Sequence, residues 1–352
     1  MAQAGNFYIG ANDEHGLNPP TGGKRTPVMP YIDRSFYENE YNRKAKQYFM
    51  IALSRCGFNV FDVKPEWQDV SINTRVSRVN ARNLSLVTTF AYNAYGSGTA
   101  FNNVNGYLTF YSDENSYAQR NRLLAYDVSA GLSETLPTNN LGIGTLTGIG
   151  MLRTVRCPAV IIEGGFMTNF YEAKLMMDPD FQKAAGEGAC MGVCDFLDVA
   201  YVPQSAKNPT LRQGARGKSV QYMQYLLRLH DFEVSPDGVF GPGTAEAVRA
   251  FQTFNGLTVD GIVGKNTWSA FLIDHTPMPT LRRGASGAAV AYLQQKLLSK
   301  LYNAGAVDGV FGGNTERAVL EFQTENCLSV DGIVGKNTWG KLMPMGGGRP
   351  MP

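Results

Sequence analysis

One stretch of the chain says most about its fold, Cys157-Pro-Ala-Val-Ile-Ile-Glu-Gly-Gly-Phe-Met-Thr-Asn169. The apolar run at 159–162 is typical of a buried strand, and Glu163 follows this run directly. A carboxylate at that position is partly desolvated, which raises its pKa toward the range of a general base. A capping or ion-paired carboxylate is the alternative interpretation. Glu163 is therefore a candidate catalytic residue.

Other β-rich runs come earlier in the chain and alternate with segments of helical periodicity. They lie at residues 58–63, 84–90 and 106–111. This alternation predicts an α/β domain in which helices cover a mostly parallel, twisted sheet on both faces, as three layers. Ligands of such domains bind outside the carboxyl ends of the strands. Polar segments at strand ends therefore matter most, and two are 12–16 and 37–42, the latter opening a helix that runs to Arg55.

Histidine is scarce, with three in the whole chain. His15 is the only one before residue 230, so any imidazole chemistry in the first 200 residues must use it. His230 ends a predicted helix, where a cationic side chain suits the helix dipole. His275 lies in a Pro-rich segment, and we expect no catalytic role for either of these two.

The last part of the chain repeats itself. The matched blocks are 211–214 and 281–284, 237–241 and 308–312, and 260–268 and 331–339. In each copy apolar residues fall at helical spacing between glycines, which predicts a small bundle of three helices. The repeated Asp-Gly motifs predict tight turns in which the glycine adopts a positive φ and the next apolar residues fill the core.

Composition excludes several classes of protein. The 32 basic and 30 acidic residues give a formal charge of +2, so the chain lacks the basic surface of a nucleic-acid binder. No apolar run is long enough to span a bilayer, and the start of the chain lacks the basic and apolar segments of a secretory signal. We therefore expect a soluble protein made in the cytoplasm, whose oligomeric state stays open.

The five cysteines are an odd number at scattered positions, which fits no disulfide framework. Cys190 and Cys194 are four residues apart on a predicted helix and therefore share a face. No histidine neighbours them, so burial in the core is the expectation and metal ligation is the alternative.

Both copies of the repeat resemble the peptidoglycan-binding repeat of bacterial cell-wall hydrolases, with its D-G-x-F-G and D-G-x-x-G-x-x-T-W signatures. The resemblance covers residues 209–273 and 279–343 and implies two three-helix bundles whose partner is bacterial peptidoglycan. A packing module without a ligand is the alternative. We expect Pro-rich linkers at 201–210 and 274–280 and a disordered tail at 344–352.

Residues 1–200 resemble the zinc-dependent N-acetylmuramoyl-L-alanine amidases of the type 3 family, as a catalytic domain. The resemblance implies that His15, in a His-Gly turn, and Glu38, at the start of a helix, ligate zinc. It implies that Glu163, in the motif at 157–169, is the general base.

The same resemblance includes the segment from Val70 to Asn80, which matches the stretch ahead of the third zinc ligand. We expect Arg75 and Asn80 to bind substrate, with Arg75 holding a carboxylate by a bidentate contact. An ordinary ion pair between Arg75 and Asp69 is an equal alternative.

The chain departs from the family at its third zinc ligand. The family has a histidine in S-x-H-x-N-A, and this chain has Thr89-Phe-Ala-Tyr-Asn-Ala94, so Ala91 occupies the ligand position. A methyl group cannot bind zinc, and catalytic zinc normally takes three protein ligands. Three explanations stay open: an inactive binding relative, an alanine introduced by engineering, or a different ligand, such as Asp13, Glu14 or Asn93.

These features favour a peptidoglycan hydrolase that cleaves the amide between N-acetylmuramic acid and the L-alanine of the stem peptide. Zinc would polarise the scissile carbonyl, and Glu163 would transfer a proton from water to the leaving amine. A metal-free wall-binding protein that kept the amidase fold is the alternative, because of Ala91. A serine or cysteine hydrolase is a third hypothesis, but no G-x-S-x-G motif occurs. We expect action at the bacterial cell wall or spore cortex.

Overall fold

The computed structural model describes the chain except for residues 17–23, 31, 205–207, 231, 272–278 and 343–352. The chain forms two compact units, the first made mostly of residues up to Gln204 and the second mostly of residues from Ser205 onward. Part of each predicted linker, His275 and the whole predicted tail lie outside the described residues. Among the described residues, no helix is long and apolar enough to cross a bilayer.

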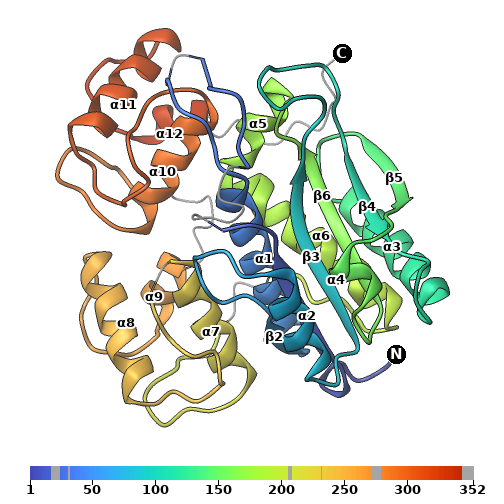
Figure 1. Ribbon diagram of the computed structural model, residues 1–352. Helices are drawn as coiled ribbons and strands as arrows, with labels where there is room; N and C mark the ends of the chain where they lie inside the picture. Colours follow the sequence, from blue (N-terminus) through green and yellow to red (C-terminus); the bar gives the residue numbers. More distant parts are fainter. Residues whose placement is uncertain (17–23, 31, 205–207, 231, 272–278, 343–352) are drawn as a thin grey trace. The chain divides into compact units, whose positions relative to one another are not determined.

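The first unit is built on a sheet. Its strands are β1 (Tyr8–Asp13), β2 (Asn59–Asp62), β3 (Leu86–Asn93), β4 (Tyr107–Tyr111), β5 (Asn140–Thr145) and β6 (Ala159–Phe166). In the described residues they form one six-stranded sheet with the order β2-β1-β3-β6-β4-β5 (Figure 1). Neighbouring strands are parallel except β4 and β6, which run antiparallel. The predicted mostly parallel sheet is thereby confirmed.

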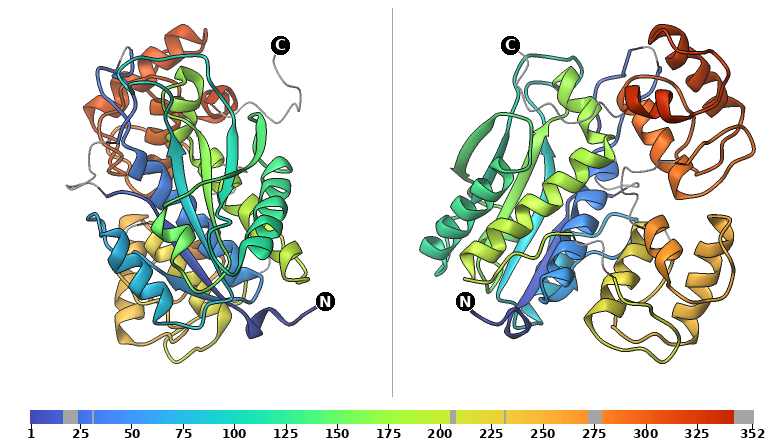
Figure 2. Two further views of the ribbon diagram at one scale, coloured as in Figure 1. Left: turned by 45° about the vertical axis from the view of Figure 1, so that its right-hand side comes forward. Right: turned by 180° about the vertical axis from the view of Figure 1, so that it is seen from behind.

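Helices cover both faces of this sheet. Those of the first unit are α1 (Glu38–Arg55), α2 (Ile72–Asn80), α3 (Ala118–Ser133), α4 (Gly150–Arg153), α5 (Phe170–Met176) and α6 (Pro179–Phe196). Helices α1, α6 and α3 lie side by side on one face, and α2 and α4 lie on the other (Figure 2). Helix α6 fits between its neighbours because it is rich in small residues: a Cβ on Gly186 would lie 2.6 Å from the backbone nitrogen of Phe49, and a Cβ on Gly131 of α3 would lie 2.3 Å from the carbonyl oxygen of Gly188. The structure therefore has the three layers expected.

Strand β3 shows how the core is divided between the two faces, because its side chains alternate. Phe90 packs on Phe49 of α1, with ring centroids 5.4 Å apart, and Tyr92 meets Tyr41 of α1 at 4.6 Å. Val87 and Ala91 point to the other face. There they join a buried apolar cluster with residues of α2, α4 and the start of β6.

Local hydrogen bonds fix the end of the β6 segment. The side-chain oxygen of Asn169 accepts the backbone N–H groups of Tyr171 and Glu172, and so caps the start of α5. The carboxylate of Glu172 then accepts the N–H groups of Gly106 and Phe166. These bonds tie the carboxyl end of β6 to the chain that enters β4.

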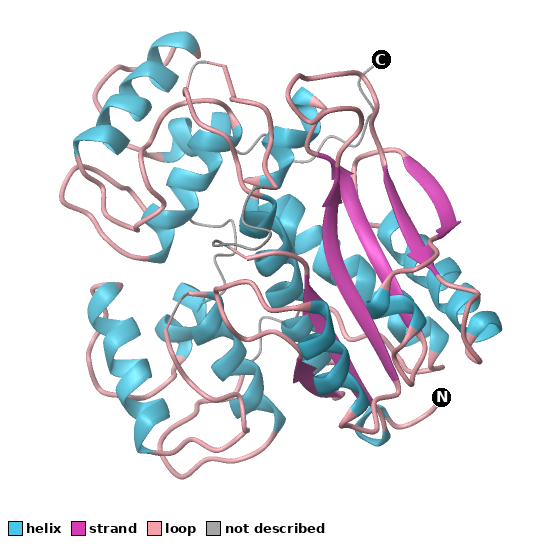
Figure 3. Ribbon diagram, in the orientation of Figure 1, coloured by secondary structure: helices cyan, strands magenta, loops and turns pink. Residues whose placement is uncertain are grey.

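The second unit contains the two repeats. Its helices are α7 (Lys218–Leu229), α8 (Pro242–Phe254) and α9 (Lys265–Phe271) in the first copy, and α10 (Ala288–Ser299), α11 (Gly313–Glu325) and α12 (Lys336–Leu342) in the second. Within the described residues each copy therefore has the three helices predicted (Figure 3). His230 follows α7, where its Nε2 lies 3.1 Å from the carbonyl oxygen of Phe271.

Each Asp-Gly turn of the repeats is closed by a buried glutamine. In the first copy Gln252 of α8 donates its amide N–H groups to Asp260 Oδ1, Ile262 O and Thr267 Oγ1, while its own oxygen accepts the N–H of Gly261. Gln224, Gln294 and Gln323 make the same set of contacts in the other turns. The glycines have φ between +67° and +73°, as predicted for these turns.

Candidate functional site

The candidate site lies at the carboxyl edge of the parallel strands. Glu14 and His15 follow β1, Glu163 lies in the second half of β6, and Glu38 is the first residue of α1. Ala91 of β3 pairs in register with Glu163. The three residues that the sequence marked as zinc ligands or base therefore come from elements that meet at one edge of the sheet.

His15 lies between two carboxylates. Its Nε2 is 3.5 Å from Oε2 of Glu38 and 3.8 Å from Oε2 of Glu14. Burial lowers the pKa of His15 to about 4, so its imidazole is neutral at neutral pH, which is the form that ligates metals. Its backbone has a φ of +60°, and the chain then passes so close to Asp69 that a Cβ on Gly16 would lie 2.1 Å from the Asp69 backbone nitrogen. Only glycine fits there.

Glu38 is oriented by two hydrogen bonds. Its Oε1 accepts the side-chain N–H of Asn42, one turn along α1, and the backbone N–H of Tyr92 at the end of β3, both at 2.9 Å. Its other oxygen faces His15. Burial raises the pKa of Glu38 to about 7, although both hydrogen bonds act to lower it. The carboxyl is therefore held in one orientation by its neighbours.

Glu163 belongs to the same electrostatic cluster. Burial, followed by the charges of Glu38 and Glu14, raises the pKa of Glu163 well above its ordinary value. Burial likewise raises the pKa of Glu14. The charges of Glu38 and Glu14 thus act on Glu163, the charge of Glu14 acts on Glu38, and Lys24 is a cation whose charge acts on all three.

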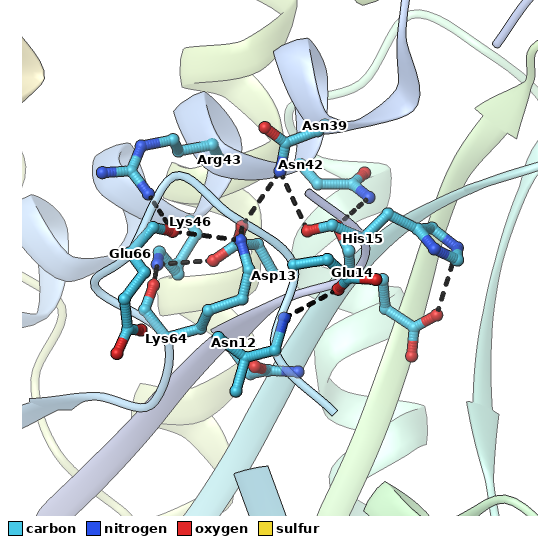
Figure 4. A network of polar contacts seen from close by, with 12 residues as sticks. Asn12, Asp13, Glu14, His15, Asn39, Asn42, Arg43, Lys46, Lys64 and Glu66 are labelled. Carbon is cyan, nitrogen blue, oxygen red and sulfur yellow. Dashed lines mark hydrogen bonds and ion pairs between the residues drawn. The ribbon is translucent and has the colours of Figure 1, made fainter. Parts of the chain in front are cut away.

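A buried network of charged side chains around Asp13, shown in Figure 4, holds the His15 turn in place. The carboxylate of Asp13 binds Lys46 Nζ at 2.5 Å through Oδ1 and Lys64 Nζ at 2.7 Å through Oδ2, and all three side chains are almost fully buried. Asn39 of α1 donates to the carbonyl oxygen of His15 at 3.1 Å. Burial alone would raise the pKa of Asp13, but the charges of Lys46 and Lys64 outweigh it and lower the pKa.

Arg75 has a different role from the one expected. Its guanidinium donates to the carbonyl oxygens of Val70 and Asp13 and pairs with Asp69 Oδ1 at 2.8 Å, and the side chain is buried. This is the ion pair that the sequence left as the alternative. All three guanidinium nitrogens contact protein groups. Arg75 therefore positions the His15 turn and the 69–70 segment instead of holding a substrate carboxylate.

Asn80, which we expected to bind substrate, makes contacts within the protein. Its side-chain amide donates to the carbonyl oxygen of Thr154 at 2.9 Å and accepts the N–H of Arg156 at 2.7 Å. These contacts lie just ahead of β6, at the amino end of the sheet, whereas Glu163 lies toward the carboxyl end. Asn80 therefore braces the α2 layer and is not carried into the proposed site.

The structure distinguishes among the three residues that the sequence offered as replacements for the missing zinc ligand. The carboxylate of Asp13 is paired with two lysines, and the side-chain oxygen of Asn93 accepts the N–H of Ala94. Glu14 remains, with its carboxylate beside Nε2 of His15. Ala91 itself is 2% exposed and belongs to the apolar cluster on the α2 face.

The donor set around His15 fits a divalent cation by its chemistry. A neutral imidazole and carboxylates are ordinary zinc ligands, and a cation would relieve the crowding of three acidic groups. Among the described residues, only a thiol cluster elsewhere brings three such ligand atoms within 4.8 Å of one another. The candidate ligand atoms around His15 therefore lie farther apart than the sulfur atoms of that thiol cluster.

Sequence reasoning did not assign Asn39, Asn42 and Lys24 to the site. Their signal was present in part, because Asn39 and Asn42 lie in the polar segment that opens α1. Residues at positions 1 and 4 or 5 of a helix share a face. Asn42 could therefore have been placed next to Glu38, but this spacing does not apply to Asn39, and the contacts of both asparagines with residues 13–15 depend on how β1 meets α1.

Comparison with known proteins shows which families the two parts of the chain match. The family model described as N-acetylmuramoyl-L-alanine amidase matches residues 16–195, and the model described as putative peptidoglycan binding domain matches 216–271 and 286–342. The chain is 31% identical over 169 residues to the amidase CwlL of Bacillus licheniformis, covering 40% of this chain and 47% of CwlL. It is 40% identical over 99 residues to the amidase CwlM of Mycobacterium tuberculosis, covering 26% of this chain and 24% of CwlM.

The chain spans less than half the length of these two curated relatives. A solved amidase from Clostridium difficile 630 aligns with 56% of this chain and 98% of its own length, at 21% identity and a TM-score of 0.47. The amidase family model covers more than half of the 352 residues. The chain therefore belongs to the N-acetylmuramoyl-L-alanine amidase family.

Proposed function

We propose that the chain is a peptidoglycan hydrolase that cleaves the amide between N-acetylmuramic acid and the L-alanine of the stem peptide. Family membership supports this reaction, and one observation carries it to these residues: His15 Nε2 lies 3.5 Å from Glu38 Oε2, and the charge of Glu38 acts on Glu163. This places an imidazole, an oriented carboxylate and a second carboxylate at one strand edge, which suits metal-assisted hydrolysis.

Zinc is the proposed cofactor, with His15 and Glu38 as ligands and Glu14 in the place of the histidine missing at Ala91. A bound zinc ion supplies Lewis-acid polarisation of the scissile carbonyl. Glu163 accepts a proton from the attacking water and returns it to the alanine nitrogen as the amide bond breaks, so the products are a lactyl carboxylate and a free amine. Hydrogen bonds from Asn42 and Tyr92 hold Glu38 in place throughout.

The proposed partner of the two repeats is the same polymer. Both match the putative peptidoglycan binding domain, and both keep the glutamine-closed turns that fix their shape. Weak sites that are tethered to the catalytic unit concentrate it on an insoluble substrate. The proposed place of action is therefore the bacterial cell wall.

One experiment on the full chain distinguishes the role of Glu14, the proposed zinc ligand, from that of Glu163, the proposed base. We expect purified peptidoglycan to give peptides with a new amino-terminal alanine and glycan strands whose muramic acid carries a free lactyl carboxylate, as seen by mass spectrometry. Glu163→Gln should keep zinc and lower turnover by about a hundredfold or more, the usual range for general catalysis. Glu14→Gln should lower both zinc content and turnover.

The exposed Glu134→Gln is the matched control and should change neither quantity. If Glu163→Gln turns over normally, the proposed base is wrong. If the chain isolated with zinc in the buffer holds none, binds peptidoglycan and releases no peptide, the metal-free wall-binding protein is the correct interpretation.

A further inference from the structure

Three cysteines meet at the end of the first unit that is remote from His15. Cys56 follows the last residue of α1, and Cys190 and Cys194 lie one turn apart on α6. Their sulfur atoms all lie within 4.8 Å of one another. Glu38 is at the other end of the 18-residue helix α1, about 27 Å away at the normal helical rise. This thiol cluster is therefore separate from the candidate active site.

The spacing of the sulfurs matches shared ligation. Cys56 Sγ and Cys190 Sγ are 3.8 Å apart. Two thiolates on one tetrahedral zinc ion, each at about 2.3 Å, are separated by about 3.8 Å. A disulfide needs about 2.05 Å, so the pair has the geometry of two ligands and not of a bond. Cys194 comes from the helical turn next to Cys190, and its sulfur lies within 4.8 Å of both other sulfurs.

Two groups beside Cys56 can stabilise negative charge on its sulfur. The backbone N–H of Val202 donates to Cys56 Sγ at 3.3 Å. Arg55, the neighbour of Cys56, pairs with Glu187 of α6 and donates to the carbonyl oxygen of Val202 at 2.7 Å. Backbone donation and a nearby guanidinium are typical of thiolate sites, whereas a cysteine that only fills space needs neither.

Burial suits a structural ion. Cys190 and Cys194 are 0% exposed and Cys56 is 7% exposed, so one edge of the cluster reaches the surface. The three cysteines come from α1 and α6, and Val202 belongs to the segment that leaves the first unit. An ion bound here would fasten that segment to both helices.

We propose that Cys56, Cys190 and Cys194 form a structural site for a thiophilic d¹⁰ cation, with Zn²⁺ as the physiological ion. Binding displaces the thiol protons to solvent, and three sulfurs leave one coordination position for a water or a backbone oxygen. The site is independent of the proposed catalytic zinc, which has only nitrogen and oxygen donors.

Cadmium tests the site on the full, reduced chain. Thiolate ligation of Cd²⁺ produces an ultraviolet charge-transfer band, and imidazole and carboxylate ligands do not. We expect the band to saturate at one Cd²⁺ per chain, to persist in His15→Ala and to disappear in Cys190→Ala. Cys327→Ala, at an exposed cysteine, and Cys157→Ala, at a buried cysteine elsewhere, should keep the band.

Thermal unfolding monitors whether each variant folds, and Cys56→Ala replaces Cys190→Ala if the latter does not. Zn²⁺ should raise the unfolding temperature of the His15→Ala chain and leave that of His15→Ala with Cys190→Ala unchanged. A wild-type chain without the band, or a band that survives both cysteine variants, would overturn the proposal. So would a Cys56–Cys190 disulfide in the reduced preparation, which mass spectrometry would show as the loss of two hydrogens.

Discussion

Glu38 and His15 are buried together in their neutral forms, and their shifts act on stability in opposite directions. Glu38 has a pKa of about 7 in the folded chain against 4.5 for a free side chain. Its contribution to stability is therefore present below about pH 4.5 and lost as the pH rises through about 7, because the native state holds a proton that the unfolded chain releases. His15, lowered from 6.5 to about 4, stabilises above its unfolded pKa and loses that contribution as the pH falls.

This balance gives a pH-dependent prediction for Glu38→Gln in the metal-free chain. The variant removes a carboxyl that must ionise at a cost, so it should gain stability relative to the wild type as the pH rises from about 5 to about 8. Urea unfolding in the presence of a chelator measures the difference in the free energy of unfolding at each pH. Glu134→Gln, at an exposed site, should show no such trend. A Glu38→Gln difference that stays constant with pH would contradict the buried, protonated carboxyl.

At this scale the sequence predicted the residues that belong to a compact motif and missed those whose role depends on distant contacts. His15, Glu38 and Glu163 each sit at a strand end or helix start that periodicity reveals, and the structure brings them to one edge, although their roles stay predictions. For Arg75 the sequence offered the ion pair with Asp69 beside a substrate contact and could not decide between them, because the contact of Arg75 with the carbonyl oxygen of Asp13 forms only when α2 packs on the sheet.

At the scale of elements, the buried glutamines of the repeats explain why the same short motifs recur. Gln252 is 1% exposed and satisfies a carboxylate, a carbonyl, a hydroxyl and an N–H at once. Gln252→Met keeps the volume, removes these four hydrogen bonds and takes from the buried N–H of Gly261 its acceptor, which should cost about 2 kcal/mol. The amides of α7 to α9 should then exchange with solvent about 30-fold faster, since 1.4 kcal/mol corresponds to tenfold.

Hydrogen exchange followed by mass spectrometry measures this effect on the full chain. The second repeat is an internal control and should keep its protection. Gln213→Met, at an exposed glutamine of the same repeat, should leave both copies unchanged. Equal protection in Gln252→Met would show that the turn does not depend on the glutamine.

Most elements could be predicted from periodicity, but the sheet order could not. The predicted runs became β2, β3, β4 and β6 with shifts of a few residues at their ends. Strand β5, Asn-Leu-Gly-Ile-Gly-Thr, was missed because an edge strand with two glycines lacks the apolar run of a buried strand. The antiparallel pairing of β4 and β6 is set by long-range contacts, which a local pattern does not encode.

At the scale of the whole molecule, two copies of one module on a single chain make binding to a repetitive polymer cooperative by linkage. Once the first repeat is bound, the second searches only the volume that its linker allows, so its local concentration is of the order of millimolar. This argument needs no new contact between the copies. It requires only that both recognise the same polymer, as their shared turns and signatures suggest.

A chain that ends at Phe271 keeps the first repeat and loses the second, and it should bind insoluble peptidoglycan about a hundredfold more weakly than the full chain. Sedimentation of Glu163→Gln chains with purified peptidoglycan measures the dissociation constant without digestion of the polymer. Doubling the linker at 274–280 with Gly and Ser should weaken binding by only about threefold, because effective concentration falls as roughly the −3/2 power of length. Equal affinity of the truncated and full chains would mean that the second copy does not bind this polymer, since a tethered second site cannot be without effect.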